Sequence, residues 1–251
     1  MLIIALILCA AIALLFKVLQ FYVPEMILRG VSILLLLPLI FDCWNPKPKR
    51  SETENTSSPT TYKIFALVSL ILYAAGDCVD ALAHKNIVYL NVTLLLNGLA
   101  NVAYSIACSP PSPLIQKEAW FFTFVVMFGA ALSQHFVMNE ELYQNRMKVI
   151  FYWLFQLSTA ILVTVTVNTR DCQDRCGDCH VYCIIGSILN VISQCSKFYS
   201  HFSATGIGID YVILGIFWFG IFWQFFSAKE WTCPELRELK QYSTIEPLYT
   251  N

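Results

Sequence analysis

Long apolar runs joined by short polar segments make up most of the chain, and this pattern constrains the fold more than any other feature. Of the 251 residues, 57% are hydrophobic and only 13% are charged, whereas soluble domains usually carry about 25% charged residues. An apolar run of about 20 residues is long enough to cross a bilayer as a helix. The sequence therefore predicts an all-α, polytopic membrane helix bundle of about eight transmembrane helices, with spans at about 2–16, 24–43, 62–82, 86–108, 119–138, 147–167, 179–202 and 207–227.

The distribution of basic residues indicates how these spans are oriented. We expect one transmembrane domain over residues 1–227, followed by a polar tail at 228–251. Lys and Arg concentrate in the loops on one side of the predicted bundle, and cytosolic loops are enriched in these residues. The prediction is a multi-pass protein of the endoplasmic reticulum, another endomembrane or the plasma membrane, with both termini in the cytosol. The formal net charge of −1 gives no indication of a nucleic-acid partner.

Two aspartates lie near the end of the apolar stretch that runs from Tyr62 to His84. An acidic side chain at membrane depth is costly, so it usually faces a cavity and has a function. Asp77, Asp80 and His84 follow an i, i+3, i+7 spacing, which places them on one face of a helix. The alternative is that Asp80 and His84 only mark the end of the helix at the level of the headgroups.

Polar side chains form stripes on several of the other predicted spans. Because polar groups in lipid need partners, such a stripe faces the interior of a bundle. The stripes either line one polar cavity, in which Arg29 and Lys197 pair with Asp77 or Asp80 or bind a lipid phosphate, or they only join helices. The residues are Arg29 in the second span, Asn97, Asn101 and Tyr104 in the fourth, Gln156 in the sixth, and Ser187, Asn190, Gln194, Lys197 and His201 in the seventh.

A cluster of cysteines precedes and enters the seventh span. Zinc sites usually have two well-separated cysteine pairs, whereas these thiols crowd into one short segment, so we expect no metal. Acylation of cytosolic thiols near the membrane and free thiols without a role both remain open. The sequence has no glycine-rich phosphate loop and no HExxH motif, and we expect no cofactor. The cluster comprises Cys172, Cys176, Cys179, His180 and Cys183.

The third span, with Ala75-Gly76-Asp77 and a second acid just beyond, resembles the YhhN family of membrane lysoplasmalogenases. The family has eight helices and a basic residue in the second, which Arg29 matches. Its fourth helix ends in a His-x-x-Tyr pattern, which here reads Asn101 to Tyr104. Its seventh helix carries a glycine and a later Ser-Asp pair, which here read Gly186 and Ser193-Gln194.

The last helix of the family has an aromatic pair a few residues before a glutamine. Phe217 and Trp218 fit the aromatic pair, and Ile221 stands at the position of the glutamine. The chain thus departs from the family at three positions, because Asn101 replaces a histidine, Gln194 replaces the second aspartate, and Ile221 replaces the late glutamine.

The resemblance implies hydrolysis of the vinyl ether bond of a lysophospholipid, lysoplasmalogen, to a fatty aldehyde and a glycerophospho-base. Asp77 would be the acid, and Asp80 would substitute for the missing second carboxylate. Two alternatives remain open, because the departures weaken the acid pair: a non-catalytic relative that binds lipid, and a small transporter or receptor that uses Asp77, Lys197 and His201 as an ion path. The residues expected to contact substrate are Arg29, Asn101, Tyr104, Asn190, Gln194 and Lys197.

Overall fold

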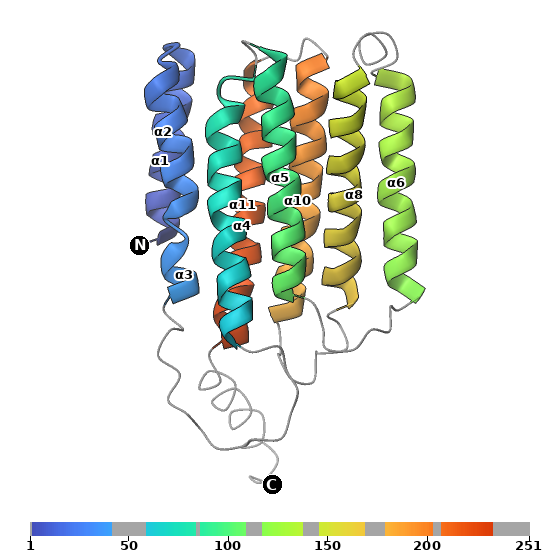
Figure 1. Ribbon diagram of the computed structural model, residues 1–251. Helices are drawn as coiled ribbons and strands as arrows, with labels where there is room; N and C mark the ends of the chain where they lie inside the picture. The colour runs from blue at the N-terminus through green and yellow to red at the C-terminus, as the bar shows by residue number, and fades with distance from the viewer. Residues whose placement is uncertain are drawn as a thin grey trace, which may run out of the picture.

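The computed structural model describes residues 2–41, 59–83, 86–108, 117–137, 146–168, 179–202 and 207–232, almost all of them helical (Figure 1). Each of the eight apolar ranges expected from the sequence overlaps a helix, and the range 24–43 overlaps two, so the all-α fold is confirmed for the described residues. The helices are α1 (Leu2–Val18), α2 (Tyr22–Leu34), α3 (Leu37–Phe41), α4 (Pro59–Asp80), α5 (Ile87–Cys108), α6 (Lys117–Val137), α8 (Arg146–Asn168), α10 (Cys179–Phe202) and α11 (Ile207–Thr232).

Three segments of the described chain are long and apolar enough to cross a membrane: Tyr22–Ile40, Val88–Cys108 and Val149–Val167. Shorter apolar stretches lie on α1, α6 and α11. Exposed leucine, isoleucine, valine and phenylalanine side chains occur on the outer faces of the bundle, while serine, asparagine and charged side chains are buried inside it. This distribution suits a protein whose surroundings are lipid, because polar groups must then find partners inside the bundle.

The helices stand side by side with their axes roughly parallel (Figure 1). Helices α1 and α2 form one edge, and α6 forms the opposite edge, where it packs on α8. Helix α5 packs between α4 and α8. Helix α11 runs behind α4 and α5 and packs most extensively against α10. Residues from α2, α4, α5, α10 and α11 therefore meet in the middle of the bundle.

The second predicted span is bent rather than continuous. Helix α2 ends at Leu34, a turn follows, and the short helix α3 begins at Leu37. Pro38 lies at the second position of α3, and proline has no backbone N–H to donate to the preceding turn of a helix. The backbone N–H of Leu36 bonds instead to the carbonyl of Ile33, 3.0 Å away. The predicted second span thus consists of two helices, and the segment Tyr22–Ile40 as a whole is long and apolar enough to cross a membrane.

Two helices extend beyond the apolar ranges expected from the sequence. Helix α4 begins at Pro59 rather than at residue 62, in agreement with the preference of proline for the first position of a helix. Helix α11 continues to Thr232, five residues beyond the end expected at 227. Residues 233–251 of the predicted tail lie outside the described residues.

Helices α10 and α11 approach most closely at two glycines. A Cβ atom added at Gly186 would lie 2.5 Å from the backbone nitrogen of Gln224, and one added at Gly220 would lie 2.8 Å from that of Asn190. Both contacts are with backbone, so a side-chain rotation cannot relieve them. Small residues allow membrane helices to approach closely, and these two glycines bring Asn190 and Gln224 within reach of each other.

We expect Gly220→Ala to destabilise the protein by about 1–3 kcal/mol, because overpacking a close contact forces backbone shifts. The matched control is Gly215→Ala on the same helix, where nothing lies within 4 Å of the added Cβ. Alanine is a better helix former than glycine, so the control should be neutral or slightly stabilising. Thermal unfolding in detergent measures both, and equal midpoints for the two variants would contradict the close contact.

Candidate functional site

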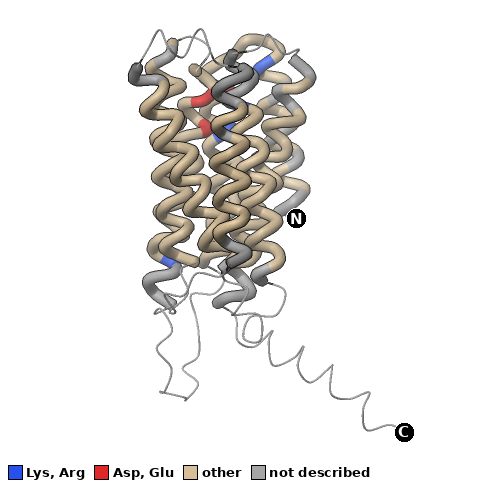
Figure 2. Tube along the Cα trace, turned by 90° about the vertical axis from the view of Figure 1, so that its right-hand side faces the viewer, with Lys and Arg blue, Asp and Glu red and all other residues tan. Residues whose placement is uncertain are grey.

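Five ionisable side chains from α2, α4 and α10 are buried together inside the bundle: Glu25, Arg29, Asp77, Asp80 and Lys197. We call them the charged cluster. In Figure 2 the acidic segments, drawn in red, lie toward one end of the helices with basic residues, drawn in blue, beside them. Glu25 and Asp77 are fully buried, and none of the five is more than 8% exposed. Burial of this kind marks the cluster as the candidate site, since charged groups at membrane depth are costly and usually functional.

Asp77 is held by donors on both of its carboxylate oxygens. Lys197 Nζ donates to Oδ1 at 2.7 Å, and the indole Nε1 of Trp218 donates to Oδ2 at 2.9 Å. Arg29 Nη1 also lies 3.8 Å from Oδ1. Asp77 is therefore held in place by residues of α10, α11 and α2.

Arg29 bridges the other two acids of the cluster. Its Nη1 donates to Asp80 Oδ2 at 3.0 Å, and its Nη2 donates to Glu25 Oε1 at 2.6 Å. Lys197 Nζ lies 3.7 Å from Asp80 Oδ2. The pairing of Arg29 and Lys197 with Asp77 and Asp80 agrees with the sequence prediction of counter-ions.

Helix geometry explains how the sequence assembles this cluster. Glu25 and Arg29 are four residues apart on α2, and Asp77 and Asp80 are three apart on α4, so each pair lies on one helix face. Sequence reasoning missed Glu25, although its i, i+4 spacing to Arg29 was a usable signal. His84, expected on the same face as the aspartates, and the side chain of His201 lie outside the described residues.

An aromatic side chain separates the charged cluster from the polar residues further along the bundle. Lys197 Nζ lies 3.7 Å from the centre of the Phe217 ring, a distance at which a cation is attracted to an aromatic face. The ring of Tyr73 packs edge-on against Phe217, with 6.2 Å between their centres. Phe217 is fully buried and forms an apolar layer between two polar networks.

The second network, which we call the amide network, joins α4, α5, α10 and α11. Tyr73 lies at its centre, where its hydroxyl donates to Asn101 Oδ1 at 2.5 Å and accepts from Asn190 Nδ2 at 2.8 Å. These bonds satisfy much of the polar stripe predicted on α10, so the described part of the stripe joins helices. The network comprises Tyr73, Asn97, Asn101, Asn190, Gln194 and Gln224.

Two further contacts extend the amide network, one between α5 and α10 and one between α10 and α11. Asn97 Nδ2 donates to Gln194 Oε1 at 3.1 Å, while Asn190 Nδ2 lies 3.4 Å from Gln224 Oε1. Tyr104, expected to contact substrate, instead donates its hydroxyl to the backbone carbonyl of Gln224 at 2.6 Å. By the family resemblance Ile221 stands at the position of a glutamine, and Gln224 lies buried in the network one turn later.

Cys183 of the predicted cysteine cluster faces the interior of the bundle. Its sulfur lies 3.8 Å from that of Cys108 and 3.6 Å from the hydroxyl of Tyr104, and its side chain is fully buried. A buried thiol is not available for acylation at the membrane surface. Cys172, Cys176 and the side chains of Cys179 and His180 lie outside the described residues. No group of three or more possible metal ligands occurs in the part of the chain that the structure describes.

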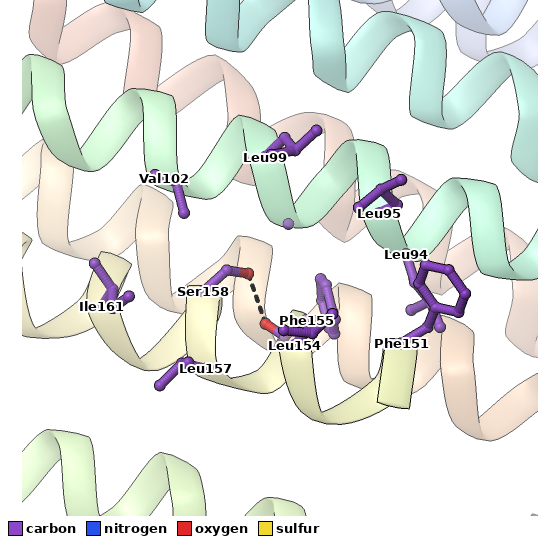
Figure 3. A pocket seen from close by; sticks show the side chains of 11 residues that line it. Leu94, Leu95, Leu99, Val102, Phe151, Leu154, Phe155, Leu157, Ser158 and Ile161 are labelled. Atoms are coloured by element: carbon purple, nitrogen blue, oxygen red, sulfur yellow. Dashed lines mark hydrogen bonds between the residues drawn. The ribbon is translucent and has the colours of Figure 1, made fainter. Parts of the chain in front are cut away.

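An apolar groove of about 210 Å³ lies between α5 and α8, away from the charged cluster (Figure 3). The hydroxyl of Ser158, its single polar side chain, already donates to the carbonyl of Phe155 at 2.6 Å. The lining of the groove therefore offers hydrocarbon contacts and no unpartnered polar side chain. Its walls are formed by Leu94, Leu95, Gly98, Leu99, Val102, Phe151, Leu154, Phe155, Leu157, Ser158 and Ile161.

No family model, no curated protein and no solved structure matches this chain. The function therefore has to be argued from the charged cluster and its surroundings.

Proposed function

We propose that the chain is a YhhN-like lysoplasmalogenase of a cellular membrane, with its eight long apolar segments crossing the bilayer and both termini in the cytosol. Its substrate is a lysophospholipid with a vinyl ether bond, and no cofactor takes part. The observation that supports this proposal best is the buried cluster in which Asp77 and Asp80 share the cations Arg29 and Lys197. Such a cluster brings two carboxyl groups and two cations together inside the bundle.

Hydrolysis of a vinyl ether requires protonation of a carbon of the double bond. Water then attacks the resulting oxocarbenium-like cation. One molecule of water is consumed, the carbon–oxygen bond of the vinyl ether breaks, and a fatty aldehyde and a glycerol hydroxyl are produced. Two carboxyl groups, one protonated and one ionised, serve this kind of chemistry at glycosidic bonds. The cluster supplies two aspartates one helical turn apart.

The hydrogen bonds of the cluster favour a different division of roles from the one expected from sequence. Asp77 accepts hydrogen bonds on both oxygens, so it is the carboxylate that steadies the cation. Asp80 is 8% exposed and is the acid of the proposed pair. In this proposal Arg29 and Lys197 also bind the headgroup phosphate, because guanidinium and ammonium groups both bind phosphate oxygens.

The amide network has a supporting role in this proposal. Asn101 and Asn190 both bond to the hydroxyl of Tyr73 on α4. Gln194 of α10 bonds to Asn97 of α5, and Tyr104 bonds to the backbone of α11. Side chains that already satisfy one another hold helices together rather than bind a ligand. In this proposal they hold α4, which carries both aspartates, against its neighbouring helices.

A second candidate function is binding of a lysolipid without turnover. The contact of 2.7 Å between Lys197 and Asp77 favours it, because a cation at that distance opposes the positive charge that develops during hydrolysis. This candidate needs the cluster as a headgroup site but needs no proton donor.

We expect the purified protein in lipid or detergent to release free aldehyde from lysoplasmalogen, and we expect Asp80→Asn to lower the rate at least about 100-fold, because a general acid contributes about 10²–10⁴-fold. Tyr182→Phe, which lies away from the cluster and keeps its ring stacked on Trp223, is the matched control. If folded wild-type protein binds lysolipids of several headgroups yet releases no aldehyde, the hydrolase proposal fails and the binding function remains.

A further inference from the structure

Two polar atoms of the charged cluster have no hydrogen-bond partner among the described residues. They are Oε2 of Glu25 and Nε of Arg29. Glu25 is fully buried and Arg29 is 3% exposed, so neither atom is in contact with bulk solvent. A buried donor or acceptor without a partner is costly, and buried water molecules commonly satisfy such atoms.

The two atoms belong to side chains that already contact each other. Arg29 Nη2 donates to Glu25 Oε1 at 2.6 Å. Because Nε and Nη2 are part of one guanidinium, and both oxygens are part of one carboxylate, this bond holds the two unpartnered atoms close together. One is a donor and the other is an acceptor. A single water molecule satisfies both, since its oxygen accepts from Nε while one of its O–H groups donates to Oε2.

A water molecule bound there lies on the same guanidinium as the proposed acid. Arg29 Nη1 donates to Asp80 Oδ2 at 3.0 Å and lies 3.8 Å from Asp77 Oδ1. Inverting glycosidases keep their acid and base about 6.5–9.5 Å apart, so that water fits between the two carboxyl groups. Here one guanidinium separates the carboxyl group of Glu25 from that of Asp80.

We propose that Glu25 Oε2 and Arg29 Nε bind the water molecule that attacks the oxocarbenium-like cation, and that Glu25 is the base for this step. The inference rests on the proposed hydrolysis, and it supplies a site for the water that the reaction consumes. Asp80 gives its proton to a carbon of the vinyl ether. The water oxygen then bonds to the cationic carbon, while one proton of the water passes to Glu25 Oε2.

The product of this attack is a hemiacetal, and its breakdown restores both carboxyl groups. The bond between the former vinyl carbon and the glycerol oxygen breaks, and the glycerol oxygen takes the proton from Glu25. The hydroxyl proton of the hemiacetal returns to Asp80 as the aldehyde forms. Glu25 is again a carboxylate, Asp80 is again an acid, and one water molecule has been consumed.

A purely structural Glu25 would only hold Arg29 in place. Glu25→Gln separates the two roles, because its amide oxygen can still accept from Arg29 Nη2, whereas its amide nitrogen takes no proton from water. A structural role predicts little change in this variant. The role of a base predicts a change in how the cation is captured.

Competition between water and methanol measures this capture. During hydrolysis of lysoplasmalogen, capture by water gives the aldehyde. Capture by methanol gives a mixed acetal that still carries the glycerophospho-base, and mass spectrometry distinguishes the two products. Acid hydrolysis in the same water–methanol mixture without protein gives the reference acetal fraction.

We expect the purified full-length protein to give a smaller acetal fraction than the reference, because the bound water captures the cation first. In Glu25→Gln the fraction should rise to the reference. The control Tyr182→Phe, in which the ring stays stacked on Trp223, should keep the wild-type fraction.

Wild-type protein that gives the reference fraction would overturn the proposal, and so would folded Glu25→Gln that keeps the wild-type fraction. In both cases the hydrolysis itself stands. If neither product forms, the proposed hydrolysis fails and the role of the water fails with it. A structure in which ordered water is visible gives a test without any variant. We expect a water molecule within hydrogen-bond distance of Oε2 and Nε, and a direct bond between these two atoms would contradict the proposal.

Discussion

Asp77→Asn is expected to destabilise the protein by about 3–5 kcal/mol, the usual cost of removing one partner from a buried ion pair. The substitution preserves size but removes the carboxylate that accepts from Lys197 at 2.7 Å and from Trp218 at 2.9 Å. Lys197 then loses its nearest negative charge inside the bundle. The midpoint of unfolding in detergent, by heat or by added denaturing detergent, measures this effect.

A double variant separates loss of the pair from loss of a single charge. Asp77→Asn combined with Lys197→Met removes both members, and replacing both partners of a buried pair with groups of similar volume is often close to neutral. We expect the double variant to recover much of the stability that the single variant loses, which a double-mutant cycle quantifies. A double variant less stable than Asp77→Asn alone would contradict the pairing of these two residues.

This prediction also affects the hydrolysis experiment. If Asp77→Asn unfolds part of the bundle, loss of aldehyde release says nothing about chemistry at Asp77. Asp80 is 8% exposed whereas Asp77 is fully buried, so Asp80→Asn disturbs the fold less. For this reason Asp80→Asn, and not Asp77→Asn, is the variant that tests the acid–carboxylate pair.

The helices themselves could be predicted because lipid imposes a simple rule on sequence. Apolar runs of bilayer length must be helical, and the polar faces of α4, α5 and α10 must point inward. Burial of Asp77, Asn101 and Asn190 follows from that rule. The pairing of Arg29 and Lys197 with the two aspartates also follows, since few cations lie inside the apolar runs and a buried carboxylate requires one.

The partners of most other polar side chains could not be predicted. A polar stripe fixes the face of a helix, but the rotation and depth of its neighbours decide which groups meet. Gly186 and Gly220 set the approach of α10 to α11, and that approach places Gln224 beside Asn190. A single chain offers no signal for such a contact, so Gln224 was missed.

The polar stripe of α10 shows the same limit for function. The sequence predicts one continuous face, and Ser187, Asn190, Gln194 and Lys197 are indeed all buried. In the structure, however, Phe217 packs between Lys197 and Tyr73, so the stripe serves two separate networks. The spacing of the stripe residues carries no information about an aromatic ring that enters from another helix.

Removing the hydroxyl of Tyr73 tests whether the amide network supports the fold. In Tyr73→Phe, Asn101 Oδ1 loses its donor at 2.5 Å and Asn190 Nδ2 loses its acceptor at 2.8 Å. Asn190 Nδ2 keeps Gln224 Oε1 at 3.4 Å, whereas Asn101 Oδ1 is left without its donor. A buried polar group without a partner costs about 1–3 kcal/mol, so we expect a loss of that size. The volume of the ring and its edge-on contact with Phe217 stay unchanged, which isolates the effect of the hydrogen bonds.

Tyr182→Phe is the control for this experiment as well, because the Tyr182 ring is partly buried and its described contacts are with the rings of Trp223 and Phe226. We expect its unfolding midpoint to match that of the wild type. Equal stability of Tyr73→Phe and Tyr182→Phe would mean that the two amides find other partners in the bundle. The amide network would then not fix the helices that carry Asp77 and Lys197, and the geometry of the charged cluster would have to depend on its own ion pairs and on the glycine contact between α10 and α11.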